Sequence, residues 1–539
     1  MMGLMQDWPL RVSRIIDHAA KYHPDRRIVS ASAEGPIVET TWRQLREGAL
    51  RSAQRLSRMG LAKGDRVGLM AWNTARHLEL WYGVPGAGGV AHTLNPRLSA
   101  EQLVYIVNHA ADRFLAFDPD LAPVVAAIAP RLETVERFIC LADAAHAPPT
   151  PFDCAPWDAA PADGDFAWVG GEEGEACGLC YTSGTTGAPK GVCYSHRSNV
   201  LHAMAMVQPD MLALSARDVL MPVVPLFHAN GWSTAYSAPM VGAGMVLPGR
   251  DLTPPALHSM LERGVTVTAA VPTVWLGLLD HMRREGLRLS TLNRVVIGGS
   301  ACPQSVIEAF QRDYGVEVLH AWGMTETSPL GSFASLKPEI LALPEAERMA
   351  AKLSVGHPPF TVDLDLRDDF GAPVLRDGAS RGRLVVRGPC VAKRYVGAEA
   401  DATDPEGWFD TGDVATMDGL GYVRIVDRSK DVIKSGGEWI SSIDLENVAV
   451  GCPGVLEAAA VGVAHPKWGE RPVLVIRPDP AAPPDAARVL DHMRPHFATW
   501  QLPDDVLFMA ALPHTATGKL SKRDLRAQLE QMGYSLPHA

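Results

Sequence analysis

The chain has 539 residues, of which 47% are hydrophobic and 21% are charged, and its formal net charge is −11. This length exceeds what a single hydrophobic core supports, so about two to four domains are expected. The acidic balance argues against a protein that binds duplex nucleic acid, because such a protein needs a basic face to displace counterions.

The sequence also argues against membrane and secreted classes. It contains no run of about 18 apolar residues, and the nearest candidate, residues 235–248, is interrupted by Gly and Pro. The N-terminus lacks a basic stretch followed by an apolar one, so no signal peptide is expected. Eight cysteines in so long a chain do not form a disulfide framework, which predicts a reduced, cytoplasmic protein.

Apolar runs and turn residues predict the following elements in chain order. Strands are expected at 67–70, 266–271, 294–297 and 316–320, helices at 99–110 and 254–263, and antiparallel strands at 382–387 and 421–426. The Ala- and Pro-rich segments 147–163 and 478–484 are expected to be a surface connector and a loop. Cys177 and Cys180 have C-x-x-C spacing, but no second pair exists and they lie in a predicted strand, which favours a structural role.

The alternation of strands and helices predicts an α/β architecture with largely parallel sheets. A charged, loop-like stretch at 427–431 follows the last of these strands and marks a candidate domain boundary. The remainder of the chain is long enough for a small α+β domain.

The most informative segment is Tyr181-Thr-Ser-Gly-Thr-Thr-Gly-Ala-Pro-Lys-Gly191. Its hydroxyl groups and glycine N–H groups can approach an anion closely, and Lys190 adds a positive charge, so the segment can hold a polyphosphate. A Walker-type loop requires Gly-Lys-Ser/Thr in sequence, whereas Ala188 and Pro189 separate Gly187 from Lys190. A Gly-rich loop taken alone is equally compatible with a plain surface turn.

This string resembles the signature of the adenylate-forming superfamily, which contains acyl-CoA synthetases, peptide-synthetase adenylation domains and beetle luciferases. Further motifs of the family follow in order along nearly the whole chain. They are Gly298-Gly-Ser-Ala301, Ala321-Trp-Gly-Met-Thr-Glu326, Gly407-Trp-Phe-Asp-Thr-Gly-Asp413, Asp427-Arg-Ser-Lys-Asp431 and Thr517-Gly-Lys519. A single motif can arise by chance, whereas an ordered series supports the resemblance.

The resemblance implies a large N-terminal AMP-binding domain at 1–429, built from two α/β subdomains and a distorted β-barrel. It also implies a small, mobile α+β domain at 430–539. The implied substrates and cofactors are a small carboxylic acid, ATP, Mg²⁺ and coenzyme A, and a homodimer is one expected assembly.

The resemblance gives each ATP contact to a residue of this chain. The polyphosphate would be held by Thr182, Ser183, Gly184, Thr185, Thr186, Gly187 and Lys190. The adenine would lie between Gly299, Ser300 and Ala301 on one side and His320, Ala321 and Trp322 on the other. Gly323 and Met324 complete this set.

The same resemblance implies the groups around the reacting atoms. Thr325 would contact the α-phosphate, Glu326 would hold Mg²⁺, and Asp413 with Arg428 would bind the ribose. Lys519 would bridge the carboxylate and the α-phosphate, where its charge offsets the repulsion between two anions. Taken singly, Asp413 would be an ordinary turn residue and Lys519 an ordinary surface charge.

A second half-reaction, transfer to a thiol, is also implied. The small domain would rotate about Lys430, withdraw Lys519 and bring Lys434, Gly436, Gly437 and Glu438 towards a tunnel for the pantetheine arm. The alternative for the Gly-Gly pair is a plain hairpin turn.

The acyl pocket is expected around His228, Trp232 and Gly323. His228 would orient the carboxylate or gate the tunnel, although a histidine in an apolar stretch is as often a core residue. Phe227 and His228 provide no acidic side chain to pair with an α-ammonium group, and burying that positive charge without a partner would be costly. The segment is most similar to medium-chain fatty acid and methylmercaptopropionate ligases, which predicts a short or medium acid without an α-amino group.

One position departs from the family pattern and several functions stay open. Arg383 stands where many relatives have Glu, which puts a local salt bridge in doubt. The preferred hypothesis is an acid–thiol ligase that makes acyl-CoA, with Lys519, His228, Lys434 and Glu326 as the catalytic set. The alternatives are loading of a carrier-protein thiol, a luciferase-like oxygenase and a nucleotide sensor without catalysis.

Overall fold

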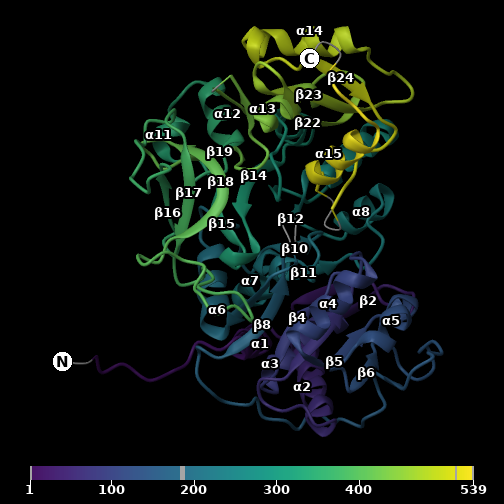
Figure 1. The fold of residues 1–539 in the computed structure, drawn as a ribbon. Helices are drawn as coiled ribbons and strands as arrows, with labels where there is room; N and C mark the ends of the chain where they lie inside the picture. The colour runs from purple at the N-terminus through teal and green to yellow at the C-terminus, as the bar shows by residue number, and fades with distance from the viewer. Residues whose placement is uncertain (1–2, 183–187, 437, 516–518, 537–539) are drawn as a thin grey trace.

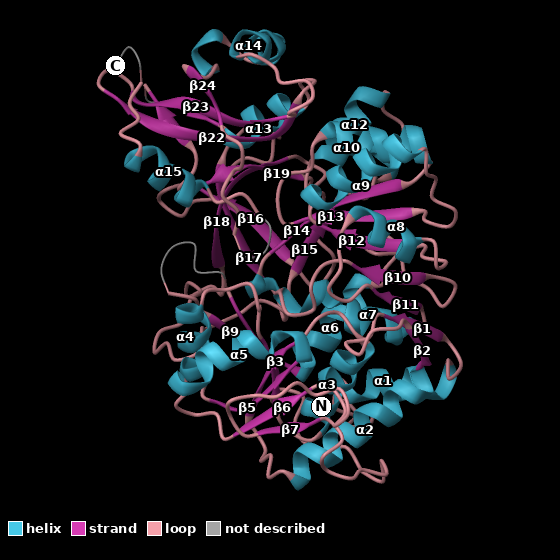
Figure 2. Ribbon diagram, turned by 90° about the vertical axis from the view of Figure 1, so that its right-hand side faces the viewer, coloured by secondary structure: helices cyan, strands magenta, loops and turns pink. Residues whose placement is uncertain are grey.

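The computed structural model describes residues 3–182, 188–436, 438–515 and 519–536. Within them the chain forms four sheets with helices packed around them (Figure 1, Figure 2). Every helix in the described ranges is too short or too polar to cross a bilayer.

The first α/β unit is a seven-stranded sheet with the order β7-β6-β5-β3-β4-β8-β9. Its strands are β3 (Arg66–Met70), β4 (Val90–Thr93), β5 (Asp112–Phe117), β6 (Arg137–Cys140), β7 (Cys154–Pro156), β8 (Ala176–Tyr181) and β9 (Gly191–Ser195). All pairs are parallel except β8 with β9. Its helices are α2 (Trp42–Arg58), α3 (Ala75–Gly86), α4 (Ala100–Ala110) and α5 (Ala122–Ile128).

The second α/β unit is an eight-stranded sheet with the order β15-β14-β13-β12-β10-β11-β1-β2, antiparallel only at its two edges. Its strands are β1 (Arg27–Ser30), β2 (Val38–Thr41), β10 (Val219–Pro222), β11 (Gly244–Leu247), β12 (Val267–Ala270), β13 (Arg294–Gly298), β14 (Glu317–Gly323) and β15 (Leu330–Phe333). Its helices are α1 (Ser13–Tyr22), α6 (His196–Met206), α7 (Thr234–Val241), α8 (Pro254–Leu261), α9 (Pro272–Glu285) and α10 (Gln304–Glu308).

The part expected as a distorted barrel is a four-stranded antiparallel sheet, which does not close on itself within the described residues. Its strands are β16 (Asp363–Arg367), β17 (Gly382–Arg387), β18 (Phe409–Met417) and β19 (Val423–Arg428), and α11 (Pro338–Leu341) and α12 (Glu345–Leu353) precede them. The predicted α/β fold with an additional antiparallel part is therefore confirmed.

The C-terminal part is a small α+β unit that lies above the rest in Figure 1. It contains β20 (Ile433–Ser435), β21 (Glu438–Ile440), β22 (Val455–His465), β23 (Gly469–Pro478), β24 (Asp505–Phe508), α13 (Ser442–Val450), α14 (Ala486–Met493) and α15 (Lys522–Gln531). Two buried apolar clusters draw only on residues beyond 432, so this unit has a core of its own.

Most predicted elements occur within two or three residues of their expected bounds, with one clear exception. Segment 147–163 was expected to be only a connector, but its residues 154–156 form β7, which pairs with β6 at the sheet edge. The Pro-rich composition concealed this strand because an edge strand tolerates proline. Cys177 and Cys180 are free, buried thiols in β8, as the structural interpretation predicted.

Candidate active site

The candidate site is a cleft of about 2320 Å³ between the eight-stranded sheet, the four-stranded sheet and the C-terminal part. Parallel strands expose their carboxyl ends at one edge, where ligands bind in open α/β sheets. The ends of β13 and β14 line this cleft, and β8 leads into the predicted phosphate loop beside it. Sheet topology therefore gathers segments that are far apart in the sequence.

The two predicted walls of the adenine site lie on neighbouring strands. In the register of β13 and β14, Ile297 stands beside His320 and Gly298 beside Ala321. Gly299 has a φ of +84°, a conformation that favours glycine, and turns the chain into the cleft. Ser300, Ala301 and Trp322 also line the cleft, so the structure brings both predicted walls together.

His320 is held as a neutral side chain in this wall. Its Nδ1 lies 3.1 Å from the carbonyl oxygen of Leu353. Burial lowers the pKa of His320 below its ordinary value. A neutral imidazole at this place can stack against an aromatic base without adding charge.

Asp413, which is buried, forms an ion pair at the cleft with Arg428, which is exposed. They are direct partners in the register of β18 and β19, and Arg428 Nε lies 2.9 Å from Asp413 Oδ1. Trp322 Nε1 donates to the other carboxylate oxygen at 2.9 Å. Burial raises the pKa of Asp413, and the charge of Arg428 opposes that shift.

Lys519 points into the cleft from the C-terminal part. A Cβ atom on Gly299 would lie 3.2 Å from Cε and 3.7 Å from Nζ of Lys519. Removal from water and, to a lesser extent, the charge of Arg428 lower the pKa of Lys519 to about 8, against an opposing increase from Asp413. The predicted catalytic lysine therefore lies beside both the wall predicted for the adenine and the ion pair predicted for the ribose.

The base of the predicted phosphate loop is closed by two hydrogen bonds. Thr182 N donates to Lys190 O at 2.9 Å, and Lys190 N donates to Thr182 Oγ1 at 3.1 Å. Both residues line the cleft. The other predicted members, Ser183, Gly184, Thr185, Thr186 and Gly187, lie outside the described residues.

Thr325 and Glu326 follow β14 in a short 3₁₀ turn that two tyrosines hold in place. Tyr194 Oη donates to the Thr325 carbonyl at 2.7 Å, and Tyr395 Oη donates to Glu326 Oε1 at 2.6 Å. Glu326 lines the cleft, and its second carboxylate oxygen has no hydrogen-bond partner among the described residues. Carboxylate oxygens suit Mg²⁺, which retains waters and phosphate ligands, so this residue fits a magnesium site.

His228 and Trp232 line the cleft on the side predicted for the acyl group. Burial and, to a lesser extent, the charge of Lys519 lower the pKa of His228 to about 3, so the imidazole is neutral. The Trp232 ring lies against the end of β13, where a Cβ on Gly298 would come within 3.0 Å of its Cη2 atom. At Gly323 a Cβ would lie 2.0 Å from the Pro329 carbonyl oxygen, so the backbone requires glycine there.

The residues predicted for the thiol step lie elsewhere in this arrangement. Lys430 is exposed in the turn after β19 and lines the cleft. Lys434, Gly436 and Glu438 belong to the β20–β21 hairpin, whose described residues do not line the cleft, and Gly437 is not described. Lys434 N donates to Glu470 Oε2 at 2.9 Å, which ties the hairpin to β23.

Sequence reasoning missed the residues that support the site. Nothing in the local pattern marks Tyr194 or Tyr395, whose partners lie 131 and 69 positions away. The doubt about Arg383 is also resolved, because it pairs with Asp410 at 2.6 Å. A local ion pair therefore exists despite the departure from the family pattern.

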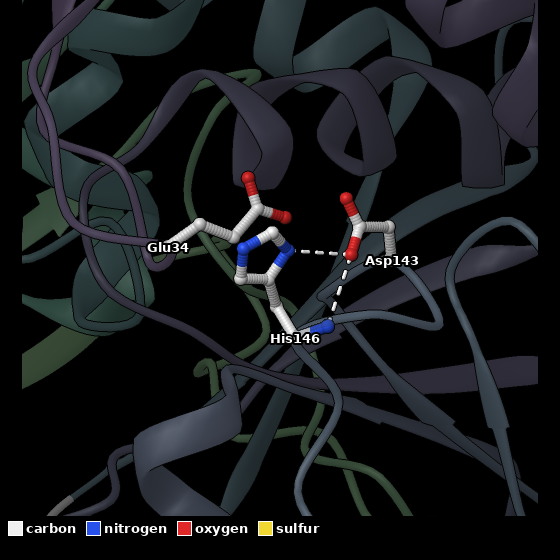
Figure 3. Close-up of side chains that lie close together, drawn as sticks. All are labelled: Glu34, Asp143 and His146. Carbon is white, nitrogen blue, oxygen red and sulfur yellow. Dashed lines mark hydrogen bonds and ion pairs between the residues drawn. The ribbon is translucent and has the colours of Figure 1, made fainter.

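Glu34, Asp143 and His146 form a separate cluster outside the cleft (Figure 3). Their ligand-type atoms lie within 4.8 Å of one another. Each group already has a protein partner, since Glu34 pairs with Arg76 at 2.6 Å and His146 Nδ1 lies 2.6 Å from Asp143 Oδ1. The Asp143 carboxylate raises the pKa of His146. The three side chains are therefore engaged with protein partners in this structure.

Comparison with known proteins agrees with this geometry. The family model described as AMP-binding enzyme matches residues 16–396, and the model described as AMP-binding enzyme C-terminal domain matches residues 444–519. The chain is 48% identical to the 3-methylmercaptopropionyl-CoA ligase of Ruegeria pomeroyi over 536 residues, or 99% of both chains. It is 43% identical to the medium-chain-fatty-acid–CoA ligase of Ectopseudomonas oleovorans, over 98% of this chain and 97% of the relative.

A solved structure is similar over nearly the same length. The o-succinylbenzoate coenzyme A synthetase of Bacillus subtilis, in complex with ATP and magnesium ion, superposes with a TM-score of 0.77 at 25% identity. The match covers 95% of this chain and 99% of that structure. Both family models and the length of these matches lead to one conclusion: the chain belongs to the family of AMP-binding enzymes.

Proposed function

We propose that the protein is an AMP-forming acyl-CoA ligase. It joins a small carboxylic acid to ATP as an acyl-adenylate, releases pyrophosphate, and transfers the acyl group to coenzyme A with release of AMP. The observation that carries the proposal is the position of Lys519, whose side chain lies against Gly299 and beside the Asp413–Arg428 pair in the cleft. The ligases of Ruegeria and Ectopseudomonas support it by their names and by full-length similarity.

In the first step, the chain's own residues hold ATP and the acid together. Asp413 accepts hydrogen bonds from the ribose, while Thr182 to Lys190 hold the distal phosphates and Thr325 the α-phosphate. Glu326 would hold Mg²⁺, which would supply positive charge to the phosphates when bound. Lys519 lies between the carboxylate and the α-phosphate, where a fixed cation stabilises the charge that develops during attack.

His228 acts in this step as a neutral group. Its low pKa excludes an imidazolium ion at neutral pH, so it can orient the carboxylate only through a hydrogen bond. Positive charge at the reacting atoms therefore comes from Lys519 and the metal. This division of roles refines the sequence-based expectation for His228.

In the second step, the C-terminal unit at 430–539 rotates about Lys430 relative to the unit at 1–429. This motion withdraws Lys519 and brings Lys434 to Glu438 to the cleft, where the thiol of coenzyme A attacks the adenylate. Separate apolar cores in the C-terminal unit support movement as a body. The present arrangement, with Lys519 in the cleft and the hairpin outside it, fits the first step.

The acid is proposed to be short or medium in length and without an α-amino group, with 3-methylmercaptopropionate as the first candidate. His228 and Trp232 provide a neutral, mostly apolar wall, which suits an alkyl or thioether chain. The name of the Ruegeria relative supports this candidate. A cytoplasmic location is proposed on the basis of the free cysteines.

The function is tested by two assays. Acid-dependent exchange of labelled pyrophosphate into ATP should occur with a subset of acids from acetate to decanoate plus 3-methylmercaptopropionate. Acyl-CoA should then form without any carrier protein. Absence of exchange with every acid of the panel would favour a nucleotide sensor, and product formation only with a carrier protein would favour the carrier-loading alternative.

A lysine variant separates the half-reactions. Lys519→Ala should lower the rate of pyrophosphate exchange at least about a hundredfold, because a misplaced catalytic group costs roughly this factor in rate. It should leave transfer of a supplied acyl-adenylate to coenzyme A within about threefold of the original enzyme. Lys21→Ala, which changes an exposed lysine on α1, serves as the control. Equal loss in both half-reactions would contradict the rotation.

A further inference from the structure

Tyr395 contacts two residues of the proposed ATP site at once. It lies in the loop between β17 and β18 and lines the cleft. Its hydroxyl donates to Glu326 Oε1 at 2.6 Å. Its ring centroid lies 4.8 Å from Lys190 Nζ, within the range of a cation–π contact.

Backbone hydrogen bonds hold the loop on both sides of Tyr395 in the sequence. Ala392 N donates to the Glu326 carbonyl at 2.7 Å, and Val396 N donates to the Gly191 carbonyl at 2.9 Å. These bonds join the loop to the turn after β14 and to β9. The ring also packs edge-on against Phe409. Tyr395 is therefore placed by its surroundings and not by its two contacts alone.

The two groups that Tyr395 contacts have opposite charge but do not pair with each other. Among the described residues, the Glu326 carboxylate accepts from the Tyr395 hydroxyl and the Lys190 ammonium faces the Tyr395 ring, and the two charged groups form no ion pair with each other. An ion pair between them would occupy the charges that the metal and the phosphates require. The Tyr395 hydroxyl donates its hydrogen to the Glu326 carboxylate, so this contact leaves the negative charge of Glu326 in place.

The hydrogen bond also selects which carboxylate oxygen remains available. With Oε1 engaged by the hydroxyl, Oε2 is the oxygen left for a metal ligand. The face of the Tyr395 ring contacts the Lys190 ammonium and does not neutralise its charge. One side chain thus sets the orientation of both groups.

We propose that Tyr395 is a positioning residue that keeps the Glu326 carboxylate and the Lys190 ammonium apart and directs both to the metal-bound phosphates of ATP. The inference rests on the proposed function, because it assigns ATP and Mg²⁺ to this cleft. It adds a residue that the sequence motifs do not mark.

Two substitutions separate the contacts of this side chain. Tyr395→Phe removes the hydroxyl and keeps the ring, so the Mg²⁺ concentration for half-maximal pyrophosphate exchange should rise by about tenfold, as for loss of a hydrogen bond to a charged group. The rate at saturating Mg²⁺ should stay within about threefold. Tyr395→Leu removes the ring as well and should additionally raise the KM for ATP.

A binding measurement tests the inference without turnover. Electron paramagnetic resonance should follow Mn²⁺ binding to the enzyme with ATP and no carboxylic acid, and Tyr395→Phe should weaken the Kd for Mn²⁺ by about tenfold. In a Glu326→Gln background the same substitution should change nothing, because its effect acts through the carboxylate. Tyr534→Phe is the matched control. The Tyr534 hydroxyl also donates to a carboxylate, that of Asp505 at 2.7 Å, but neither residue lines the cleft.

The outcomes distinguish this inference from the proposed function. An unchanged metal dependence and Mn²⁺ affinity in Tyr395→Phe would overturn the inference, as would a fall in rate that saturating Mg²⁺ does not recover. Absence of exchange in the original enzyme with every acid would instead count against the proposed function. Thermal unfolding of each variant checks that it is folded before the comparison is made.

Discussion

The charge state of Lys519 predicts how adenylation depends on pH. The pKa of this buried ammonium is lowered to about 8 in the protein without ATP, chiefly because it is removed from water. Only the ammonium form can offset the repulsion between the acid and the α-phosphate. Since the lowered pKa leaves less ammonium as pH rises, kcat/KM for ATP should fall on the alkaline side of about pH 8.

The expected size of this fall follows from the pKa. With a pKa of about 8, Lys519 is about 90% protonated at pH 7 and about 3% protonated at pH 9.5, so kcat/KM should fall about thirtyfold. A lysine at its ordinary pKa would remain about 90% protonated at pH 9.5. The rate of attack by coenzyme A should instead rise with pH, because a thiol of ordinary pKa becomes more ionised over this range.

Acid-dependent pyrophosphate exchange, measured between pH 6.5 and 9.5, gives the pH dependence of adenylation. Transfer from a supplied acyl-adenylate to coenzyme A provides the contrasting profile in the same buffers. Lys519→Arg keeps a charged group at all these values, so its lower activity should show no alkaline fall. A flat profile for the original enzyme, or the same fall in Lys519→Arg, would refute the reasoning.

Three further substitutions follow from the cleft. Asp413→Asn should raise the KM for ATP by about 10- to 100-fold in steady-state assays, because a charged acceptor is lost while Trp322 can still donate to the amide oxygen; an unchanged KM would contradict ribose binding. Trp232→Ala should improve kcat/KM for decanoate about tenfold on an acid panel, since room for two more methylenes is worth about 1.6 kcal/mol; an unaltered preference would remove Trp232 from the acyl wall. Arg424→Ala breaks an exposed 2.7 Å pair with Asp444 across the two units and should lower adenylation less than about fivefold; a larger loss would show that this pair governs closure.

Local chemistry explains what the sequence predicted well. The strand before the predicted phosphate loop and the turn glycine at 299 follow from apolar runs and turn residues, which act over a few positions. The order of motifs added the roles proposed for Asp413 and Lys519, which no single residue indicated. Segment 154–156 was missed because its strand depends on an available sheet edge and not on its composition.

The sequence by itself determined the α/β class, the predicted phosphate-binding segment and the family resemblance, because each depends on residues that are close together in the sequence. Only the tertiary structure decided that Trp322 would support Asp413 from 91 positions away and that Tyr395 would stand between Lys190 and Glu326. It also placed Lys519 in the cleft and set its pKa near 8 through burial and the charge of Arg428. These features depend on strand order and on the meeting of two units, and such long-range packing leaves no periodic signal along the chain.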